Sequence, residues 1–183
     1  PDMASHIASL IMEAMNAECC QNFAGPKHTL VDFHRMMTRL VEMEDSQYSY
    51  RNVLAAYTSG GILAGICVAY DGGKLHQLRR RFYEAALEAF GIDYTGMTDE
   101  TEDGEFYIDS LAVSSNFRGK GIASQLLQAT IERGAELGIP TVGLLVDKGN
   151  PKAEALYQRL GFVYVNDSTW GGHPMRHLQY KHD

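Results

Sequence analysis

Hydrophobic residues recur at every third or fourth position in three stretches of the first half of the chain, the spacing of amphipathic helices. Between the second and third stretches, two short apolar runs flank the dipeptide Gly60-Gly61, a pattern typical of a β-hairpin. Asp32 follows Thr29 by three residues and completes a capping box. The expected elements are a helix capped by Asp2 and ended by residues 22–26, a helix capped by Thr29, strands over 51–57 and 62–70, and a helix over 74–90.

The second half of the chain alternates apolar strands with amphipathic helices joined by short connections. This order is typical of an α/β sheet that contains parallel strands. The expected elements are strands over 106–113, 141–146, 162–165 and 177–180, and helices over 121–137 and 151–160. We therefore interpret residues 1–183 as one α/β domain.

Two segments lack a regular pattern and are expected to be loops. Five carboxylates crowd residues 99–105, and we expect this acidic segment to be solvated and mobile. Residues 164–175, which carry Trp170 and His173, are expected to form the second loop.

Composition narrows the possible function classes. The 16 Lys and Arg residues against 23 Asp and Glu give a formal net charge of −7, which argues against nucleic-acid binding. No apolar run approaches the roughly 20 residues that span a bilayer, so we expect a cytoplasmic protein without membrane contact. The three cysteines form no CxxC pair and are expected to be reduced thiols. His173 and His177 have the helical spacing of a ligand pair, but no third ligand is nearby, so no metal is expected.

A glycine-rich turn leads from an apolar strand into a helix within the segment Val113–Ala123. Such a turn directs successive backbone N–H groups at one point, where the positive end of the helix dipole also lies. Gly119 and Gly121 leave room for a ligand near the main chain, and Arg118 and Lys120 supply positive charge. The segment matches neither GxGxxG nor GxxxxGK[ST]. By itself it is equally compatible with a phosphate-binding turn and with an ordinary loop before a helix.

Two motifs together resemble those of the GCN5-related N-acetyltransferases (GNAT). The run from Leu111 to Ala123 is similar to motif A of that family, Q/R-x-x-G-x-G/A, and Asn150 to Phe162 is similar to motif B, N-x-x-A-x-x-x-Y-x-x-x-G-F. The motifs stand in the family's order, and the preceding helices and hairpin match its layout. The resemblance covers most of the chain. It implies a central mixed β-sheet flanked by helices, with a V-shaped opening between the motif A strand and its parallel neighbour.

Three features depart from the family pattern. Family members begin with a strand before the first helix, and we expect that strand to be missing here, because the first helix starts near residue 1. Ser115 stands where proline is frequent. Residues 71–104 form a longer segment than a minimal member needs, in a region where substrate-side elements vary.

The resemblance implies acetyl-CoA as the cosubstrate, with its pyrophosphate on the motif A turn. The positions implied to contact the phosphates, mostly through the backbone, are Arg118, Gly119, Lys120, Gly121, Ile122, Ala123 and Ser124. Leu111, Ala112 and Val113 are implied to lie beside the pantetheine arm, with the backbone N–H near Val113 polarising the thioester carbonyl. Asn150 is implied to contact the cosubstrate, although a residue in front of Pro151 is also a good helix cap without any ligand.

The resemblance also implies catalytic roles. Tyr157 is the implied general acid, because a hydroxyl with an ordinary pKa of about 10 stays protonated at neutral pH and can donate to the departing thiolate. A buried core aromatic is the alternative interpretation of this residue. The attacking amine must lose a proton, and Asp109 is the first candidate for the base, with Glu105 second. A carboxylate at the end of a strand without a catalytic role is the alternative for Asp109.

The implied reaction transfers an acetyl group from acetyl-CoA to a primary amine of a small molecule or peptide by direct attack. No cysteine lies in either motif, so a covalent intermediate on the enzyme is not expected. The other hypothesis is a non-catalytic acyl-CoA-binding sensor or interaction module, against which the intact Tyr157 counts. The sequence does not identify the amine, but its acidic balance suits a cationic one such as a polyamine, an aminoglycoside or a peptide N-terminus. A homodimer, common in the family, is left open.

Overall fold

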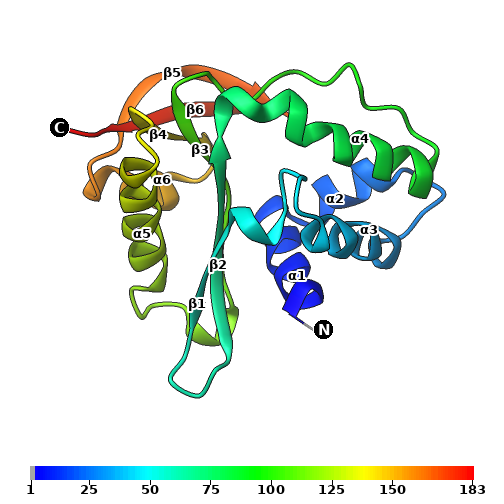
Figure 1. Cartoon of the computed structure of the whole chain (residues 1–183), viewed down its shortest axis with the longest axis horizontal. Helices are drawn as coiled ribbons and strands as arrows, with labels where there is room; N and C mark the ends of the chain where they lie inside the picture. The colour runs from blue at the N-terminus through cyan, green and yellow to red at the C-terminus, as the bar shows by residue number, and fades with distance from the viewer. Residues whose placement is uncertain (1–2) are drawn as a thin grey trace.

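A computed structural model describes residues 3–183, which fold around one mixed β-sheet (Figure 1). The six strands lie in the order β1-β2-β3-β4-β6-β5, and only the neighbours β3 and β4 run parallel. The strands are β1 (Val53–Tyr57), β2 (Leu63–Asp71), β3 (Glu105–Val113), β4 (Thr141–Asp147), β5 (Val163–Trp170) and β6 (His173–Lys181). The mixed sheet confirms the expected fold class. Within the described residues the first element is a helix, which begins at Met3.

Helices cover both faces of the sheet. The first four lie on one face and the last two on the other (Figure 1). They are α1 (Met3–Met15), α2 (Ala17–Ala24), α3 (Leu30–Glu42), α4 (Leu75–Phe90), α5 (Ile122–Glu136) and α6 (Pro151–Arg159). None of the helices in residues 3–183 is both long and apolar enough to cross a membrane.

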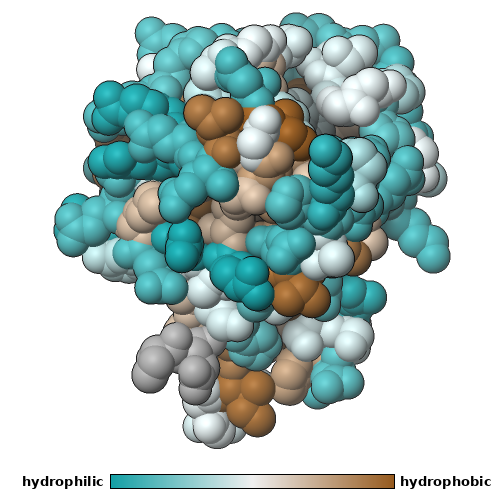
Figure 2. Space-filling model, turned by 90° about the vertical axis from the view of Figure 1, so that its right-hand side faces the viewer, coloured by the Kyte–Doolittle hydropathy of each residue, from teal (hydrophilic) through white to brown (hydrophobic). Residues whose placement is uncertain are grey.

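Each face of the sheet has its own hydrophobic core. One core packs buried side chains of the first helical layer, such as Ile11, Phe33 and Phe82, against β2. The other packs Leu127 and Ile131 of α5 against β3 and β4. The outer surface of the first layer is mainly hydrophilic, and hydrophobic side chains gather in one area near the upper centre of the view and at a few places below it (Figure 2). The helices therefore have the apolar and polar faces that their residue spacing predicts.

The expected capping box is present at the start of α3. The carboxylate of Asp32 accepts the N–H of Thr29 at 2.9 Å, and the hydroxyl of Thr29 accepts the N–H of Asp32 at 3.3 Å. The hydrogen bond from the Thr29 backbone is the main reason that the pKa of Asp32 lies below its usual range. This helix begins where its sequence predicts.

The first expected helix is instead divided into α1 and α2 at Asn16. Asn16 has a φ of 72° with an extended ψ of 159°, and its side chain caps α2 by accepting the N–H of Cys19 at 2.9 Å. Hydrophobic spacing reports which side chains face the core and not the backbone conformation of a single residue, so it alone did not reveal the break. The expected cap at Asp2 lies outside the described residues.

The segment 164–175 is not the loop that we expected but most of a β-hairpin. β5 and β6 pair antiparallel from Val163 opposite Gln179 to Trp170 opposite His173. The turn consists of Gly171 and Gly172, with φ values of 58° and 80°. Two-residue hairpin turns of this kind require positive φ at both positions, which two consecutive glycines supply. The strands predicted over 162–165 and 177–180 were therefore too short.

The two parallel strands pair over only four positions and then diverge. Residues 105–108 of β3 lie opposite residues 141–144 of β4. Beyond these positions β3 pairs only with β2, and β4 pairs only with β6. The expected V-shaped opening therefore lies between residues 109–113 and 145–147.

Candidate active site

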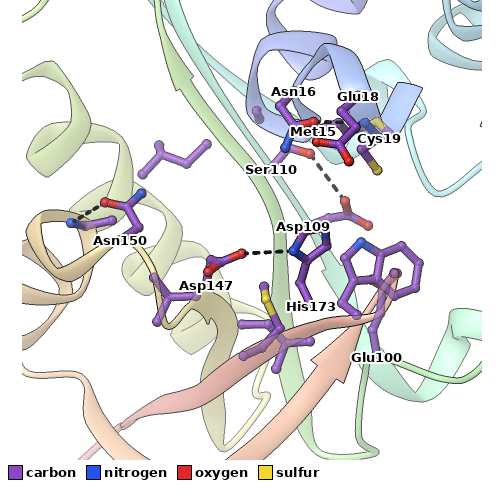
Figure 3. A pocket seen from close by; sticks show the side chains of 18 of the residues that line it. Met15, Asn16, Glu18, Cys19, Glu100, Asp109, Ser110, Asp147, Asn150 and His173 are labelled. Atoms are coloured by element: carbon purple, nitrogen blue, oxygen red, sulfur yellow. Dashed lines mark hydrogen bonds and ion pairs between the residues drawn. The ribbon is translucent and has the colours of Figure 1, made fainter. Parts of the chain in front are cut away.

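A cavity of about 460 Å³ lies where β3 and β4 diverge (Figure 3). Its walls come from the ends of α1 and α2, from β3 and β4, from α6, and from the tip of the β5–β6 hairpin. Four of its lining residues are carboxylates, namely Glu18, Glu100, Asp109 and Asp147. No Lys or Arg of the described chain lines it. The cavity therefore favours positively charged ligands.

Asp109 enters this cavity from a β-bulge. Val68 lies opposite Ser110 and Ala69 opposite Ile108, so Asp109 is the extra residue of β3. A bulge re-aims a side chain, which is one reason that bulges are found beside active sites. The Tyr70 hydroxyl and the Gln47 amide donate to Asp109 Oδ2 at 2.7 and 3.1 Å.

Burial raises the pKa of Asp109, and its hydrogen bonds with Tyr70, Gln47 and Ser110 oppose that effect. The Ser110 hydroxyl donates to Asp109 Oδ1 at 3.3 Å. These donors hold the carboxylate in place at the edge of the strand gap. A carboxylate with a raised pKa is a better proton acceptor than an exposed one.

Glu100 corrects the prediction that the acidic segment is fully solvated. Its side chain is only 4% exposed and lines the cavity. The buried guanidinium of Arg79 donates to Glu100 Oε1 at 3.2 Å and to the Thr98 carbonyl at 3.2 Å. Burial, and after it the charge of Asp109, raise the pKa of Glu100 to about 8, while Arg79 opposes the shift. The sequence reasoning missed this residue.

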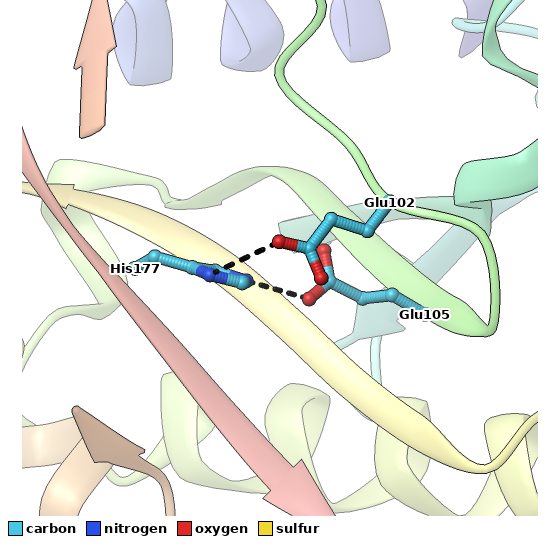
Figure 4. Close-up of side chains that lie close together, drawn as sticks. All are labelled: Glu102, Glu105 and His177. Atoms are coloured by element: carbon cyan, nitrogen blue, oxygen red, sulfur yellow. Dashed lines mark hydrogen bonds and ion pairs between the residues drawn. The ribbon is translucent and has the colours of Figure 1, made fainter. Parts of the chain in front are cut away.

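Glu105, the second candidate base, lies outside the cavity lining. Its buried carboxylate accepts hydrogen bonds from Nε2 of His177 at 2.6 Å and from Gln179 at 2.8 Å (Figure 4). The hydrogen bond to Glu105 raises the pKa of His177. This geometry is a structural ion pair and does not support Glu105 as the base for a substrate in the cavity.

His173 and His177 do not have the geometry of the helical ligand pair that their sequence spacing suggested. His173 and His177 lie on the strand β6 rather than on a helix, so four residues separate them by about 13 Å. Candidate ligand atoms of Glu102, Glu105 and His177 do lie within 4.8 Å of one another (Figure 4). However, the 2.6 Å contact between His177 and Glu105 is the length of a charge-assisted hydrogen bond, shorter than the spacing of two ligands around one ion.

Tyr157 lines the cavity from α6. Its ring packs against Phe162 with the centroids 6.0 Å apart. Burial raises the pKa of Tyr157 to about 12, so its hydroxyl is protonated at neutral pH. The residue thus contributes to the core with its ring and to the cavity lining at the same time.

Asn150 both caps a helix and lines the cavity. Its side chain caps α6 by accepting the N–H of Ala153 at 3.2 Å, and it lines the cavity (Figure 3). The helix-cap interpretation is therefore confirmed. A contact with a cosubstrate remains a prediction.

The motif A turn has the features of an anion cradle. Gly119 and Gly121 have φ values of 78° and 79°, and no atom lies within 4 Å of the position that a Cβ would occupy at either residue. No side chain caps the N-terminus of α5. The amides at this helix end are therefore available to an anion.

The charged residues of this turn lie at its surface. Nε of Arg118 donates to the Val113 carbonyl at 3.1 Å, and Nζ of Lys120 lies 5.6 Å from the centroid of the Phe117 ring. The turn residues 118–124 are not part of the cavity lining, whereas Leu111 is. The turn and the cavity thus occupy the two ends of the strand gap.

The backbone of Val113 faces this gap. The N–H of Ser114 donates to the Ala64 carbonyl of the neighbouring hairpin at 2.8 Å. Because backbone groups alternate sides along a strand, the N–H of Val113 points away from β2, toward the side where β4 has diverged. It is therefore placed to donate to a ligand in the opening.

The sequence model of the acetyltransferase (GNAT) family matches residues 32–162. The chain belongs to this family. A crystal structure of an acetyltransferase with 27% sequence identity superimposes with a TM-score of 0.79, over 97% of this chain and 94% of the other. The sheet order, the strand gap and the two motifs are thus those of a GNAT domain.

Curated relatives match shorter parts of this GNAT chain. Mycothiol acetyltransferase of Propionibacterium freudenreichii subsp. shermanii is 36% identical over 78 residues, which are 42% of this chain and 24% of that protein. The spermine/spermidine N(1)-acetyltransferase of Bacillus subtilis is 27% identical over 94 residues, which are 50% of this chain and 62% of that protein. The matches therefore span less than two thirds of either relative.

Proposed function

We propose that this GNAT protein transfers the acetyl group of acetyl-CoA to a cationic primary amine by direct attack, without a covalent intermediate on the enzyme. The observation that carries the proposal is that Tyr157 of α6 and Asp109 of β3 line one cavity at the point where β3 and β4 separate. Family membership supports acetyl-CoA as the donor.

In this proposal, acetyl-CoA is held along the strand gap. Its pyrophosphate accepts hydrogen bonds from the uncapped amides of residues 119–124, and Arg118 and Lys120 add positive charge. The pantetheine arm lies beside residues 111–113 and near Asn150. The N–H of Val113 donates to the thioester carbonyl and stabilises the oxyanion that forms there.

Asp109 then takes a proton from the bound ammonium, and the free amine attacks the thioester carbon. The new C–N bond forms as the carbonyl oxygen becomes negative, and the C–S bond breaks when the carbonyl re-forms. Tyr157 gives its proton to the leaving sulfur and regains one from the nitrogen, which becomes the amide. The products are the N-acetylated amine and CoA with a free thiol.

Cys19 does not compete as a nucleophile, although it lines the cavity. Burial and the charge of Glu100 raise the pKa of its thiol. A thiol that stays protonated at neutral pH is a poor nucleophile. This supports direct attack by the amine.

The acidic lining supports a positively charged acceptor. The name of the Bacillus subtilis relative, a spermine/spermidine acetyltransferase, points to polyamines as one class to test. Aminoglycosides and peptides with a free N-terminus are the other classes that the charge suits.

Calorimetry with acetyl-CoA, followed by a thiol-release assay over a panel of these amines, tests the proposal. We expect acetyl-CoA to bind and at least one cationic amine to release CoA thiol. Binding without release across the panel would identify an acyl-CoA-binding sensor instead. Absence of acetyl-CoA binding would exclude both functions.

A further inference from the structure

Glu100 presents a buried carboxylate oxygen that the protein satisfies poorly. Oε1 accepts a hydrogen bond from Arg79 at 3.2 Å, but the one protein partner of Oε2 in the described residues is the Tyr107 hydroxyl at 3.5 Å. Charged hydrogen bonds of a buried carboxylate are normally shorter, at about 2.6–2.9 Å. Oε2 therefore has capacity for a donor from a ligand in the cavity.

The fixed charges around this oxygen do not cancel. Arg79 contributes one positive charge, and ionised Glu100 and Asp109 contribute two negative charges. Tyr70 and Gln47, which hold Asp109, are neutral donors. A buried charge without a partner is costly, so this cluster needs one further positive charge.

The other titratable groups near the pair supply no second buried positive charge. They are Glu18 and Cys19 of α2, Tyr48, Tyr70 of β2, Tyr107 of β3, Asp147 of β4, His173 of β6, and Asp99, whose carboxylate lies 3.6 Å from Arg79 and 2.8 Å from the exposed His76. Burial raises the pKa of the Cys19 thiol and of the three tyrosines, which therefore stay neutral. Glu18 is exposed, and Nδ1 of His173 lies 3.9 Å from the partly exposed Asp147 carboxylate.

We propose that Glu100 and Asp109 together form one cation site, which holds a single proton in the free enzyme and the ammonium group of the acceptor in the complex. This inference rests on the proposed function and adds Glu100 to it as an acceptor-binding residue. The raised pKa of Glu100 is consistent with the proton-loaded state.

In this proposal, the net charge of the buried cluster of Arg79, Glu100, Asp109 and the bound proton or ammonium stays constant through the catalytic cycle. Binding of R–NH₃⁺ releases one proton from the pair to solvent. Transfer of a proton from the ammonium to the pair restores the one-proton state and leaves R–NH₂ to attack. After the amide and CoA leave, the pair is again loaded with one proton, so one turnover releases one proton overall.

Carboxyl carbon NMR of the glutamate-labelled protein tests the free state. We expect one glutamate signal, absent in Glu100→Gln, to titrate near pH 8. In Asp109→Asn the same signal should titrate at lower pH, because the repelling charge is gone. Asp103→Asn, an exposed change in the same segment outside the cavity, should leave it in place. Titration of Glu100 at the ordinary glutamate pKa, near 4.3, would overturn the proposal.

Calorimetry tests the exchange with 1,4-diaminobutane as the probe, titrated into the CoA-bound protein in buffers of different ionisation enthalpy. We expect about one proton released per amine bound near neutral pH. Glu100→Gln should abolish the release and weaken binding about tenfold, the effect of losing one charged hydrogen bond. Binding without proton release, or equal binding by the Glu100→Gln protein, would contradict the inference.

These outcomes are separate from those of the proposed function. Failure of every amine to release CoA thiol would refute catalysis. The NMR titration of Glu100 and the proton release on binding of 1,4-diaminobutane would still decide whether Glu100 and Asp109 form the cation site.

Discussion

Tyr157 packs in the core and also lines the cavity, so one side chain combines a structural position with its proposed catalytic role. Its ring packs on Phe162, while its hydroxyl belongs to a residue that lines the cavity. The burial that stabilises the ring also raises the pKa of the hydroxyl. A phenol that stays protonated at neutral pH has a proton to give, which the proposed acid role requires.

Replacement of Tyr157 by Phe should therefore reduce turnover and leave binding intact. We expect kcat to fall about 100-fold, the effect of losing a general acid, with KM for acetyl-CoA unchanged within about twofold. Steady-state thiol-release kinetics measure both constants. Tyr164→Phe, which removes an exposed hydroxyl on β5, is the control and should change neither. A wild-type kcat in Tyr157→Phe would refute the acid role.

Glu100 should make the stability of the protein depend on pH. Its folded-state pKa is raised above the ordinary glutamate value, so its contribution to stability is complete below that ordinary value and is lost as pH rises through about 8. The free energy of unfolding should therefore decrease between about pH 5 and pH 8. Denaturant unfolding at several pH values measures this slope.

Glu100→Gln should flatten the slope, because glutamine does not titrate. Asp103→Asn should retain the wild-type slope, since that side chain is exposed. If the free energy of unfolding changes with pH in the same way in Glu100→Gln and in the wild type, Glu100 has the same pKa in the folded and unfolded protein.

At the scale of elements, α4 holds the acidic segment in place through one buried arginine. Arg79 is 1% exposed and reaches both the carboxylate of Glu100 and the carbonyl of Thr98. The neighbouring Arg80 is 64% exposed and has only a 4.0 Å contact with Glu84. The two arginines therefore form a natural comparison.

Arg79→Leu should lower the free energy of unfolding by about 3 kcal/mol, because it leaves a buried carboxylate without its charged partner. Arg80→Leu should change it by less than about 0.5 kcal/mol. Chemical denaturation of both variants provides the comparison. Equal effects would mean that the buried pair does not anchor the segment.

The two ends of α5 provide a second matched pair. Gly121 precedes the helix and Gly138 follows it, with φ values of 79° and 72° and open space beside both. Alanine at either position should cost about 1 kcal/mol of stability through backbone strain. Only Gly121→Ala should also weaken acetyl-CoA binding in calorimetry, because it displaces the amides proposed to bind the pyrophosphate. Equal affinities in the two variants would argue against that cradle.

The elements that the sequence predicted well are those whose signals are local. The capping box of Thr29 and Asp32 and the motif A turn each depend on neighbours a few residues away. The burial of Glu100 depends on Arg79, which lies 21 residues earlier, so a polar segment was expected to be solvated. The bulge at Asp109 depends on the register with β2, which no local pattern reports. The Gly171-Gly172 pair, with positive φ at both residues, is likewise a local signal of a hairpin turn.

At the scale of the whole molecule, the four-position ladder between β3 and β4 leaves the sheet incomplete at its centre. A ligand that binds only the folded protein stabilises it by mass action. Acetyl-CoA at about 100 times its Kd should therefore add about 2.7 kcal/mol and raise Tm by several degrees. Calorimetric melting measures the shift, which should be smaller in Gly121→Ala than in Gly138→Ala. An unchanged Tm would contradict binding in the strand gap.

In the proposed function, the opening at residue 109 also separates the chain into two stretches with different tasks. Glu100 and the partners Gln47, Tyr70 and Arg79 come before Asp109, while the turn proposed to bind the pyrophosphate and Tyr157 come after it. If the proposed function holds, substitutions that alter acceptor choice can accumulate in the early stretch without disturbing donor binding, with Asp147 of β4 and the tip of the last hairpin as later contributors to the acceptor side. Such modular inheritance would let the scaffold acquire new acceptors through exchange of its N-terminal part alone.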